Sequence, residues 1–436
     1  MTRARGGDAR VRRLLVSHAL AAIAMSLPWP LLLVLVWERV GDSEHGPLLV
    51  GFTAAARMLP YVLLSWATGS LGDRFRRDRV LRATLVSRTV LLGVVALAVS
   101  QGWLLIAVLA ATAAVTCGTP AYPLLAAAIP QLAGGARRRA TDTLVTIEVG
   151  AFVVGPALGG LLLAEATRPW LGPLAVALGA AGLVLVLGVS IPAPVPDAGR
   201  PASPRDLPAL VWASPNLLAA LGVVALLNLT AGAASLVLLP MSESVWDAGA
   251  RGFGVATGWL GLGALGAPLL WWIRGSATRR RRGGLALLVL ALLAVAMAPD
   301  LGWALAPLAL AGAATVQVES SVTEVIQDGV PDAHRAGVLG LGDSVIVGAS
   351  LVGSLCAPWL ASVVGPRLLL ILLALVGVAA IAVPRGHRVR RSAGRSPAVG
   401  ATMRYGPTRA TRAAGPPQGA LPRRSQFRGD PAAGER

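Results

Sequence analysis

The sequence predicts an all-α membrane protein with twelve transmembrane helices in two pseudo-symmetric six-helix halves. The chain of 436 residues is 55% hydrophobic and only 14% charged, with a mean hydropathy of +0.67, whereas soluble domains carry roughly 25% charged residues. Apolar segments of about 20 residues, the length that crosses a bilayer, recur along the chain. A proline-rich segment near the midpoint separates two similar sets of them. A soluble fold would expose most of this apolar surface, so a multi-pass membrane protein is expected.

The expected helices are the apolar segments between polar loops, taken in chain order. The first segment follows a basic stretch but is longer than a signal peptide and lacks a small-residue cleavage site, so we expect a retained span. The ninth segment is the shortest. The twelve segments lie near 14–38, 47–71, 80–100, 103–130, 141–164, 170–191, 215–240, 252–273, 284–299, 303–326, 337–362 and 366–383.

The chain divides into five expected regions. A weak internal repeat supports two related halves, because Ile129-Pro-Gln-Leu precedes a basic loop and Glu148, while Val330-Pro-Asp-Ala precedes a basic pair and Asp343. Two such halves are the layout of secondary transporters with a site near the membrane midplane. The regions are a basic cytoplasmic N-terminus (1–13), an N-terminal six-helix half (14–191), a cytoplasmic linker (192–208), a C-terminal six-helix half (209–384) and a basic cytoplasmic tail (385–436). The tail is rich in Arg, Pro, Gly and Ala and is expected to be disordered.

The net charge of +18 would suggest nucleic-acid binding in a soluble protein. Residues 1–13 and 385–436 contribute +14 of it, so no nucleic-acid partner is expected, and the tails could instead contact anionic lipid. The short loops on one side of the expected spans hold sixteen arginines and those on the other side four, which predicts that both termini are cytoplasmic. The sixteen are Arg74, Arg76, Arg77, Arg79, Arg82, Arg137, Arg138, Arg139, Arg200, Arg205, Arg274, Arg279, Arg280, Arg281, Arg282 and Arg335.

The residue inventory excludes several classes of protein. All 39 basic residues are Arg, so a P-loop ATPase and a Schiff-base enzyme or photoreceptor both lack the lysine that they need. No His-Glu-x-x-His sequence or Cys/His cluster offers metal ligands. The sequence Gly340-Leu-Gly-Asp343 also marks intramembrane aspartyl proteases, but the Tyr-Asp pair of such enzymes is absent. We therefore expect no enzyme, no metal and no cofactor.

A loop of small and charged residues joins the second and third expected spans. Small residues let helix ends approach closely, and a carboxylate among guanidinium groups forms pairs that must break if the helices move. This loop resembles the signature loop of the major facilitator superfamily, a transporter family, although Arg76 stands where that family has glycine. The matching residues, which the resemblance implicates in gating, are Gly69, Gly72, Asp73, Arg74 and Arg77.

In that family the loop closes the cytoplasmic side against the eleventh helix. The resemblance therefore implies that Asp73 faces the start of helix eleven near Gly337 to Gly340, where N–H groups favour an anion. The counterpart in the second half, Arg274 to Arg282, keeps the positive charge but lacks the acid. We interpret it as a topology signal only.

The fifth expected span contains a Gly-Pro-x-x-Gly-Gly sequence that resembles the end of a motif of drug/proton antiporters in the same superfamily. Glycine and proline allow a kink and close helix approach. The upstream spacing departs from the motif at Ala151, and the fourth span lacks the Arg of those antiporters, so their proton-coupling arrangement is left open. The residues of this helix-five motif are Gly155, Pro156, Gly159 and Gly160.

Ionisable groups inside the expected spans are costly and so mark candidate sites. In the N-terminal half these are Arg57, Arg88 and Glu148. We expect one of the two arginines to pair with Glu148 and hold that half together, which is a structural alternative to a role in transport.

In the C-terminal half, Glu319 has no basic residue at similar depth and lies on helix ten, which by the family resemblance lines the central cavity. It is the first candidate for proton coupling or cation contact. Glu324 and Asp343 come next, although Glu324 lies about one turn from the cytoplasm and is expected to be hydrated. Asn228 and Thr230 in the seventh span are the few neutral polar groups nearby.

The resemblance predicts a secondary active transporter of the bacterial cytoplasmic membrane that works by alternating access. Arg57-Met-Leu-Pro60 and Val330-Pro-Asp-Ala-His-Arg335 are most similar to the branch of drug, macrolide and siderophore exporters. We expect a multidrug-type antiporter that exports a small amphipathic molecule and is driven by the proton gradient, with the proton part implied by the resemblance. The alternatives are a nutrient importer or facilitator on the same fold and a non-transporting scaffold or sensor. The expected partners are the substrate and the lipid bilayer, and the chain is expected to be a monomer.

Overall fold

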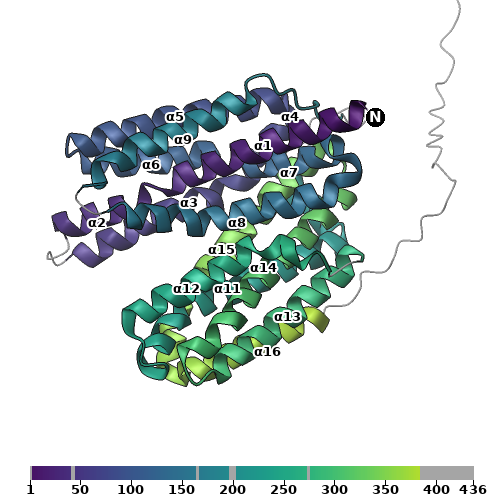
Figure 1. Ribbon diagram of the computed structural model, residues 1–436. Coiled ribbons are helices and arrows are strands. Elements are labelled where there is room, and N and C mark those ends of the chain that lie inside the picture. The colour runs from purple at the N-terminus through teal and green to yellow at the C-terminus, as the bar shows by residue number, and fades with distance from the viewer. Residues whose placement is uncertain (1, 41–44, 164–165, 196–202, 273–274, 383–436) are drawn as a thin grey trace, which may run out of the picture. The chain divides into compact units, whose positions relative to one another are not determined.

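The computed structural model describes residues 2–40, 45–163, 166–195, 203–272 and 275–382, and the predicted tail at 385–436 lies outside these ranges. All regular secondary structure in the described ranges is helical, as the sequence predicts (Figure 1). Up to residue 191 the elements are α1 (Thr2–Ser26), α2 (Trp29–Val40), α3 (Gly46–Gly69), α4 (Leu71–Arg74), α5 (Arg77–Ser100), α6 (Leu104–Gly118), α7 (Ala121–Leu132), η1 (Gly134–Ala136), α8 (Arg137–Leu161), η2 (Arg168–Trp170) and α9 (Leu171–Val186).

After residue 203 the helices continue to Ala382. They are η3 (Pro204–Asp206), α10 (Leu207–Trp212), α11 (Pro215–Pro240), η4 (Met241–Val245), α12 (Gly249–Leu265), η5 (Ala267–Trp272), α13 (Ala277–Met297), α14 (Leu301–Gly329), α15 (Asp332–Val364) and α16 (Pro366–Ala382). The short helix α10 spans the predicted boundary between the linker and the second half. At the other end of the chain, α1 begins at Thr2 and so extends into the region predicted as an N-terminal tail.

Two predicted segments are each divided into two helices beside a proline. The first is divided at Leu27 and Pro28, between α1 and α2, and the fourth at Thr119 and Pro120, between α6 and α7. Proline lacks the N–H that an α-helix needs, and its ring clashes with the preceding turn, so it either kinks a helix or, as at these two places, ends it. The sequence pattern gave the apolar length of these segments but not their breaks.

Eight helical stretches in the described residues are long and apolar enough to cross a membrane. They are Ala9–Val40, Arg77–Ser100, Leu104–Leu132, Gly134–Leu161, Arg168–Val186, Pro215–Val245, Leu301–Gly329 and Asp332–Val364. The remaining predicted segments coincide with α3, α12, α13 and α16. Of these, α13 begins earlier than predicted because the Ser276 side chain caps it, so Arg279 to Arg282 lie in its first turns instead of a loop.

The helices pack in two groups that meet along α3 and α15. In the first group α1 packs against α8 and α9, and α5 packs against α6 and α9; in the second, α14 packs against α12 and α13, and α11 against α15. Glycines let α3 and α15 approach closely: a methyl group on Gly69 would lie 2.7 Å from the carbonyl oxygen of Ala336, and one on Gly340 would clash with that of Ser65. This crossing brings Asp73 and Asp343 next to residues far away in the sequence.

We call the end of the bundle where α5, α8, α13 and α15 begin the arginine-rich end. It carries the arginines from Arg74 to Arg82, from Arg137 to Arg139, from Arg279 to Arg282, and Arg335. The other end, where α2 ends and α9 begins, is called the opposite end.

Candidate functional site

A central cavity of about 720 Å³ lies between the two groups of helices. Its lining comes from α3, α7, α8, α11, α12, α13, α14, α15 and α16 and is mostly Ala, Gly, Val and Leu. Three carboxylic acids, from three different helices, are among the lining residues: Glu148 of α8, Glu319 of α14 and Asp343 of α15. From these carboxyls the lining extends along α3 to Gly51 and along α15 to Leu355, which is toward the opposite end. A concave, mostly apolar site with a few convergent polar groups is typical of small-molecule binding.

Glu319 lies in the middle of α14 and is buried. Its Oε1 accepts a hydrogen bond of 2.9 Å from Nδ2 of Asn228, which lies on α11. The sequence predicted no cationic partner for this acid, and the partner that the structure places beside it is a neutral amide. Among the described residues, Glu319 therefore has a hydrogen bond that orients it toward the cavity but no opposite charge in contact with it.

Asp343 is equally buried, on α15. The hydroxyl of Ser65, on α3, donates a hydrogen bond of 2.6 Å to its Oδ2. This contact joins the two groups of helices at the level of the cavity, because α3 and α15 belong to different groups. Ser65 was not among the candidates, since a lone serine in an apolar segment gives no signal in the sequence.

Glu148 has a partner that the sequence analysis missed. Nε2 of the buried His18, on α1, lies 2.7 Å from Oε2 of Glu148. The expected pairing with Arg57 or Arg88 is therefore wrong, because α1 and not α3 or α5 supplies the nearest basic group. A histidine inside an apolar segment is the signal that could have identified this pair.

The two arginines of the N-terminal spans make other contacts. Nη2 of Arg57 lies 3.5 Å from the hydroxyl of Ser26, and its Cζ lies 5.1 Å from the centre of the Phe152 ring. Arg88 is buried and donates a hydrogen bond of 2.6 Å to the carbonyl oxygen of Ala21. Neither arginine lines the central cavity, so they support the helix packing around it.

At the arginine-rich end, the Asp73 carboxylate binds the backbone of α15. Its Oδ1 accepts a hydrogen bond of 3.0 Å from the N–H of Ala336, and its Oδ2 accepts one of 2.7 Å from the N–H of Gly337. The resemblance indicates this contact at the start of the eleventh predicted span, which is α15 in the structure. Gly337 and Gly72 leave room for the contact, because a methyl group on Gly337 would lie 3.3 Å from Oδ2 of Asp73 and one on Gly72 would lie 3.2 Å from the Ala336 side chain. The contact ties the loop between α3 and α5 to the second group of helices.

Arg77 reinforces the same junction from a fully buried position. Its Nη2 lies 3.2 Å from Oδ1 of Asp332 and 3.8 Å from Oδ1 of Asp73, and its Nε donates to the carbonyl oxygen of Gly72. Asp332 also accepts hydrogen bonds from Gln131 and Arg335. Arg74, in contrast, is exposed. The buried charges of the junction therefore form one network across the two groups of helices.

Burial at this junction raises the pKa of Asp73 to about 7, even though the N–H groups of Gly337 and Ala336 and the Arg77 guanidinium lower it. The raised pKa reflects the loss of water around the carboxyl group when α4 (Leu71–Arg74) lies against α15. The protonation state of Asp73 is thus linked to the closure of this end.

The counterpart segment of the second half is more than a topology signal. Arg280 is fully buried at the start of α13, with its Nη2 2.9 Å from Oε1 of Glu324 and its Nη1 3.3 Å from Oδ1 of Asp142. The expectation that Glu324 is simply hydrated is wrong, because the carboxyl group is buried beside Arg280. Arg137 and Asp328 form a further pair between α8 and α14, with Nη2 and Oδ2 3.0 Å apart. Ion pairs thus join the two groups of helices at a second place.

The helix-five motif packs α8 against the α1–α2 corner. Methyl groups on Gly155 and Gly159 would clash with Ser26 and with the carbonyl oxygen of Leu27, whereas Gly160 has open space beside it. Pro156 lies inside α8. The glycines allow this close approach.

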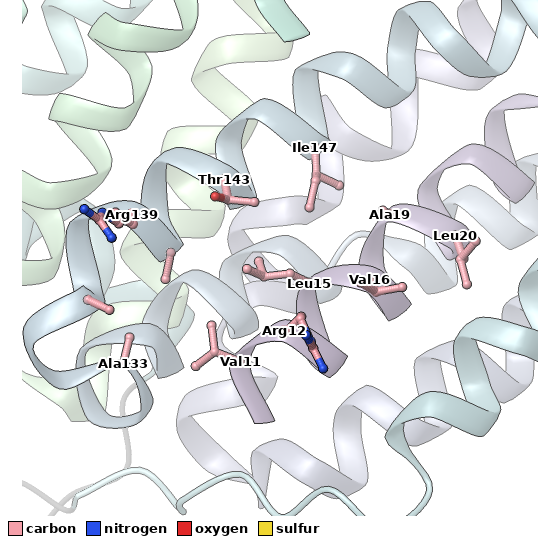
Figure 2. Close-up of a pocket in the computed structure, with 12 residues that line it drawn as sticks. Val11, Arg12, Leu15, Val16, Ala19, Leu20, Ala133, Arg139, Thr143 and Ile147 are labelled. Carbon is pink, nitrogen blue, oxygen red and sulfur yellow. The ribbon is translucent and has the colours of Figure 1, made fainter. Parts of the chain in front are cut away.

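A second cavity, of about 430 Å³, lies between α1 and α8 (Figure 2). It is lined mainly by Val11, Leu15, Leu20 and Ile147 together with small residues, and its two arginines, Arg12 and Arg139, are exposed. It shares no lining residue with the central cavity. We therefore take the central cavity as the candidate site.

Comparisons with known proteins agree on the family. The sequence profile of the Major Facilitator Superfamily matches residues 14–348, and no curated protein matches the sequence. Among solved structures, the human organic anion transporter MFSD10 (TETRAN) is 17% identical with a TM-score of 0.65, covering 86% of this chain and 98% of that one. A bacterial homologue of the iron transporter ferroportin, in the outward-facing state, is 15% identical with a TM-score of 0.62, covering 86% and 96%. The E. coli fucose:proton symporter FucP is 11% identical with a TM-score of 0.68, covering 85% and 97%.

The solved structures are too dissimilar in sequence to show more than a shared fold. The sequence profile matches most of the chain and therefore shows the family. Together with the apolar helices, they confirm a multi-pass membrane protein. They also confirm the prediction that the chain is not an enzyme, since members of the matched family are transporters. The chain belongs to the Major Facilitator Superfamily of transporters.

Proposed function

We propose that this protein is a secondary active transporter of the bacterial cytoplasmic membrane that exports a small amphipathic molecule in exchange for protons. In this proposal the chain crosses the membrane twelve times: α3, α12, α13 and α16 add to the eight stretches that are long and apolar enough to cross. The arginine-rich end faces the cytoplasm, as the positive-inside rule predicts. The protein works as a monomer with its site between the two halves.

The observation that carries the proposal is the central cavity together with its closed end. The cavity extends toward the opposite end, while Asp73, Arg77 and Arg280 tie the two halves together at the arginine-rich end. With that end in the cytoplasm, this arrangement corresponds to the outward-facing state of alternating access. Export then requires a second state in which these contacts break and the cavity opens to the cytoplasm.

Glu319 is the proposed proton carrier. It faces the cavity from the middle of α14, and its partner, Asn228, is neutral, so gain or loss of a proton changes the net charge of the cavity. A carboxyl group binds either a proton or a cationic substrate group, which is the property that an exchanger needs. Asp343 also has a neutral partner, the hydroxyl of Ser65, and is the second candidate for the proton carrier.

The lining favours an amphipathic substrate over a sugar. Apart from its three carboxyls, the lining is mostly aliphatic, and several of its hydroxyls are already hydrogen-bonded within the protein, among them those of Tyr122, Ser235, Thr315 and Ser354. A sugar needs hydrogen-bond partners for most of its hydroxyls, because polar groups buried without partners are costly. The resemblance of the helix-five motif to that of drug/proton antiporters supports export.

The test is transport by the full chain in proteoliposomes with an imposed pH gradient. A panel of lipophilic drugs and siderophore-like compounds is offered to vesicles in which the arginine-rich end faces outward, with and without a protonophore. We expect uptake of one or more compounds that stops when the protonophore collapses the gradient. Flux that ignores the gradient would favour a facilitator, and the absence of substrate-dependent flux would favour a scaffold or sensor.

A further inference from the structure

We infer that the central cavity selects organic monocations with an apolar body. This inference rests on the proposed function and specifies the substrate class of the same site. It follows from the charges that line the cavity, the partners of those charges, an unpartnered hydroxyl, and the size and apolarity of the lining.

The charged residues that line the cavity all have the same sign. Among the residues that the structure describes, the lining contains Glu148, Glu319 and Asp343, and no Arg or His. Arg57 is not among the lining residues, and its guanidinium contacts Phe152 and Ser26. A buried anion would meet three acids and no cation in the lining. Because a buried charge is costly unless an opposite charge accompanies it, the cavity disfavours anionic substrates.

The three acids are neutralised to different degrees. Nε2 of His18 lies 2.7 Å from Oε2 of Glu148, whereas in the described part of the chain Glu319 and Asp343 receive hydrogen bonds only from the neutral groups of Asn228 and Ser65. When ionised, these two carboxylates lack a counter-charge in the low-dielectric interior. A substrate cation supplies that counter-charge, which makes Glu319 and Asp343 the residues that determine specificity.

An unpartnered hydroxyl marks the same wall of the cavity. Thr230 lines the cavity from α11, two residues beyond Asn228, and is only 1% exposed. Within the described part of the chain its Oγ1 has no hydrogen-bond partner, and the same holds for Thr257 on α12. Buried hydroxyls without partners are uncommon in folded proteins. A bound molecule that carries a hydrogen-bonding group in addition to its positive charge would satisfy Thr230.

The shape of the site indicates an organic cation and not a metal ion. Nowhere in the described ranges do three or more His, Cys, Asp or Glu side chains group closely enough to hold a metal ion. The cavity volume of about 720 Å³ lies in the range of sites for drug-sized ligands, roughly 300–1,000 Å³. Its aliphatic lining offers contacts to an apolar body and few hydrogen bonds. Carboxylates at separate positions on such a surface suit a bulky ion with delocalised or shielded charge.

The test is equilibrium binding of two matched ions to the purified full-length protein. Tetraphenylphosphonium and tetraphenylborate have nearly the same size and shape but opposite charge. Binding is measured by equilibrium dialysis at pH 8 without any gradient, and protein-free micelles give the background. We expect a preference for tetraphenylphosphonium of roughly tenfold or more, the order that one unscreened carboxylate supplies at close range. Equal binding of the two ions, or a preference for the borate, would overturn the inference.

Variants assign the preference to particular residues. Glu319→Gln and Asp343→Asn should each weaken tetraphenylphosphonium binding by roughly tenfold, and the double variant should no longer distinguish the two ions. Glu38→Gln is the matched control, because Glu38 is an exposed carboxyl group that pairs with Arg168 outside the cavity; it should bind as the natural chain does. Size-exclusion chromatography checks that each variant is folded. Discrimination that persists in the folded double variant would contradict the assignment.

The binding assay and the transport assay can reject this inference and the proposed function separately. Charge-selective binding without gradient-driven transport would leave this inference standing and reject the proposed function. Gradient-driven transport of a drug, together with equal binding of the two ions, would support the proposed function and reject this inference.

Discussion

The arginine-rich end and the central cavity both contain buried carboxylates, but the two regions treat them differently. At the arginine-rich end, Asp73 and Asp332 have N–H groups and the Arg77 guanidinium as partners, and Glu324 has Arg280. In the cavity, the described residues provide Glu319 and Asp343 with only an amide and a hydroxyl as partners. Paired charges hold two surfaces together, whereas a carboxylate with a neutral partner remains able to bind a proton or a cation. The comparison distinguishes carboxylates that hold the two groups of helices together from carboxylates that are free to bind a proton or a substrate.

The largest effect is expected from Glu319→Gln, which removes the proposed proton carrier while keeping the shape of the side chain. Transport that is sensitive to a protonophore should be abolished, because glutamine does not ionise. The measurement is the initial uptake rate in proteoliposomes over a range of pH, with Glu38→Gln as the control. An unchanged pH dependence would contradict the role of Glu319. The carboxylates of the cavity would then not differ in function from those of the arginine-rich end.

Asp73→Asn tests whether the contacts at the arginine-rich end control the closure of the protein. Asparagine can accept one of the two backbone hydrogen bonds but presents its own N–H₂ group to the other, so the contact with Ala336 and Gly337 is weakened. We expect normal expression and a loss of most transport, roughly tenfold or more, since each lost charge-assisted hydrogen bond is worth about 1.5–3 kcal/mol. Near-normal efflux in this variant would show that the contact does not control access.

Arg280→Gln tests whether the second half contributes to closure. The substitution leaves Glu324 buried without its cation, which typically costs about 3–5 kcal/mol. A fall of several degrees in the melting temperature is expected, whereas the exposed neighbour Arg279→Gln should have little effect. Adding Glu324→Gln to Arg280→Gln should restore part of the loss, because the buried charge is then removed. Equal melting temperatures for Arg280→Gln and Arg279→Gln would return Arg280 to a role in topology alone.

The smallest expected effect is a pH dependence at Asp73. Its pKa is raised from 3.8 to about 7 in the closed structure, so the folded protein binds this proton more tightly than the unfolded chain does. The resulting stability is fully present below pH 3.8 and is lost as the pH rises toward and through about 7, with a slope of at most about 1.4 kcal/mol per pH unit.

Melting temperatures between pH 5 and pH 8 measure this effect. The natural chain should lose stability relative to Asp73→Asn as the pH rises, because the asparagine does not titrate. Two parallel curves would show that the carboxyl group keeps an ordinary pKa at the junction.

Much of the fold could be predicted from the sequence because its signals are local. Apolar length predicts helices, the arginine asymmetry predicts sidedness, and the loop around Asp73 resembles a family motif. Glu148, Glu319 and Asp343 were candidates because any acid inside an apolar segment is unusual, and all three line the central cavity. The same reasoning placed Glu324 in water, since a residue one turn from a helix end shows no sign of burial in the sequence alone.

Only the tertiary structure decided which residues meet. Asn228 and Glu319 are 91 residues apart in the sequence, His18 and Glu148 are 130 apart, and Ser65 and Asp343 are 278 apart. No helical or loop periodicity relates positions so distant, and their contacts depend on how α1, α3 and α11 pack against α8, α15 and α14. The sequence alone determined an all-helical membrane transporter with a few acids in its interior. The packing determined which of those acids are neutralised and which face the cavity with their charge uncompensated, because a counter-charge stabilises a buried acid only where the fold places the two in contact.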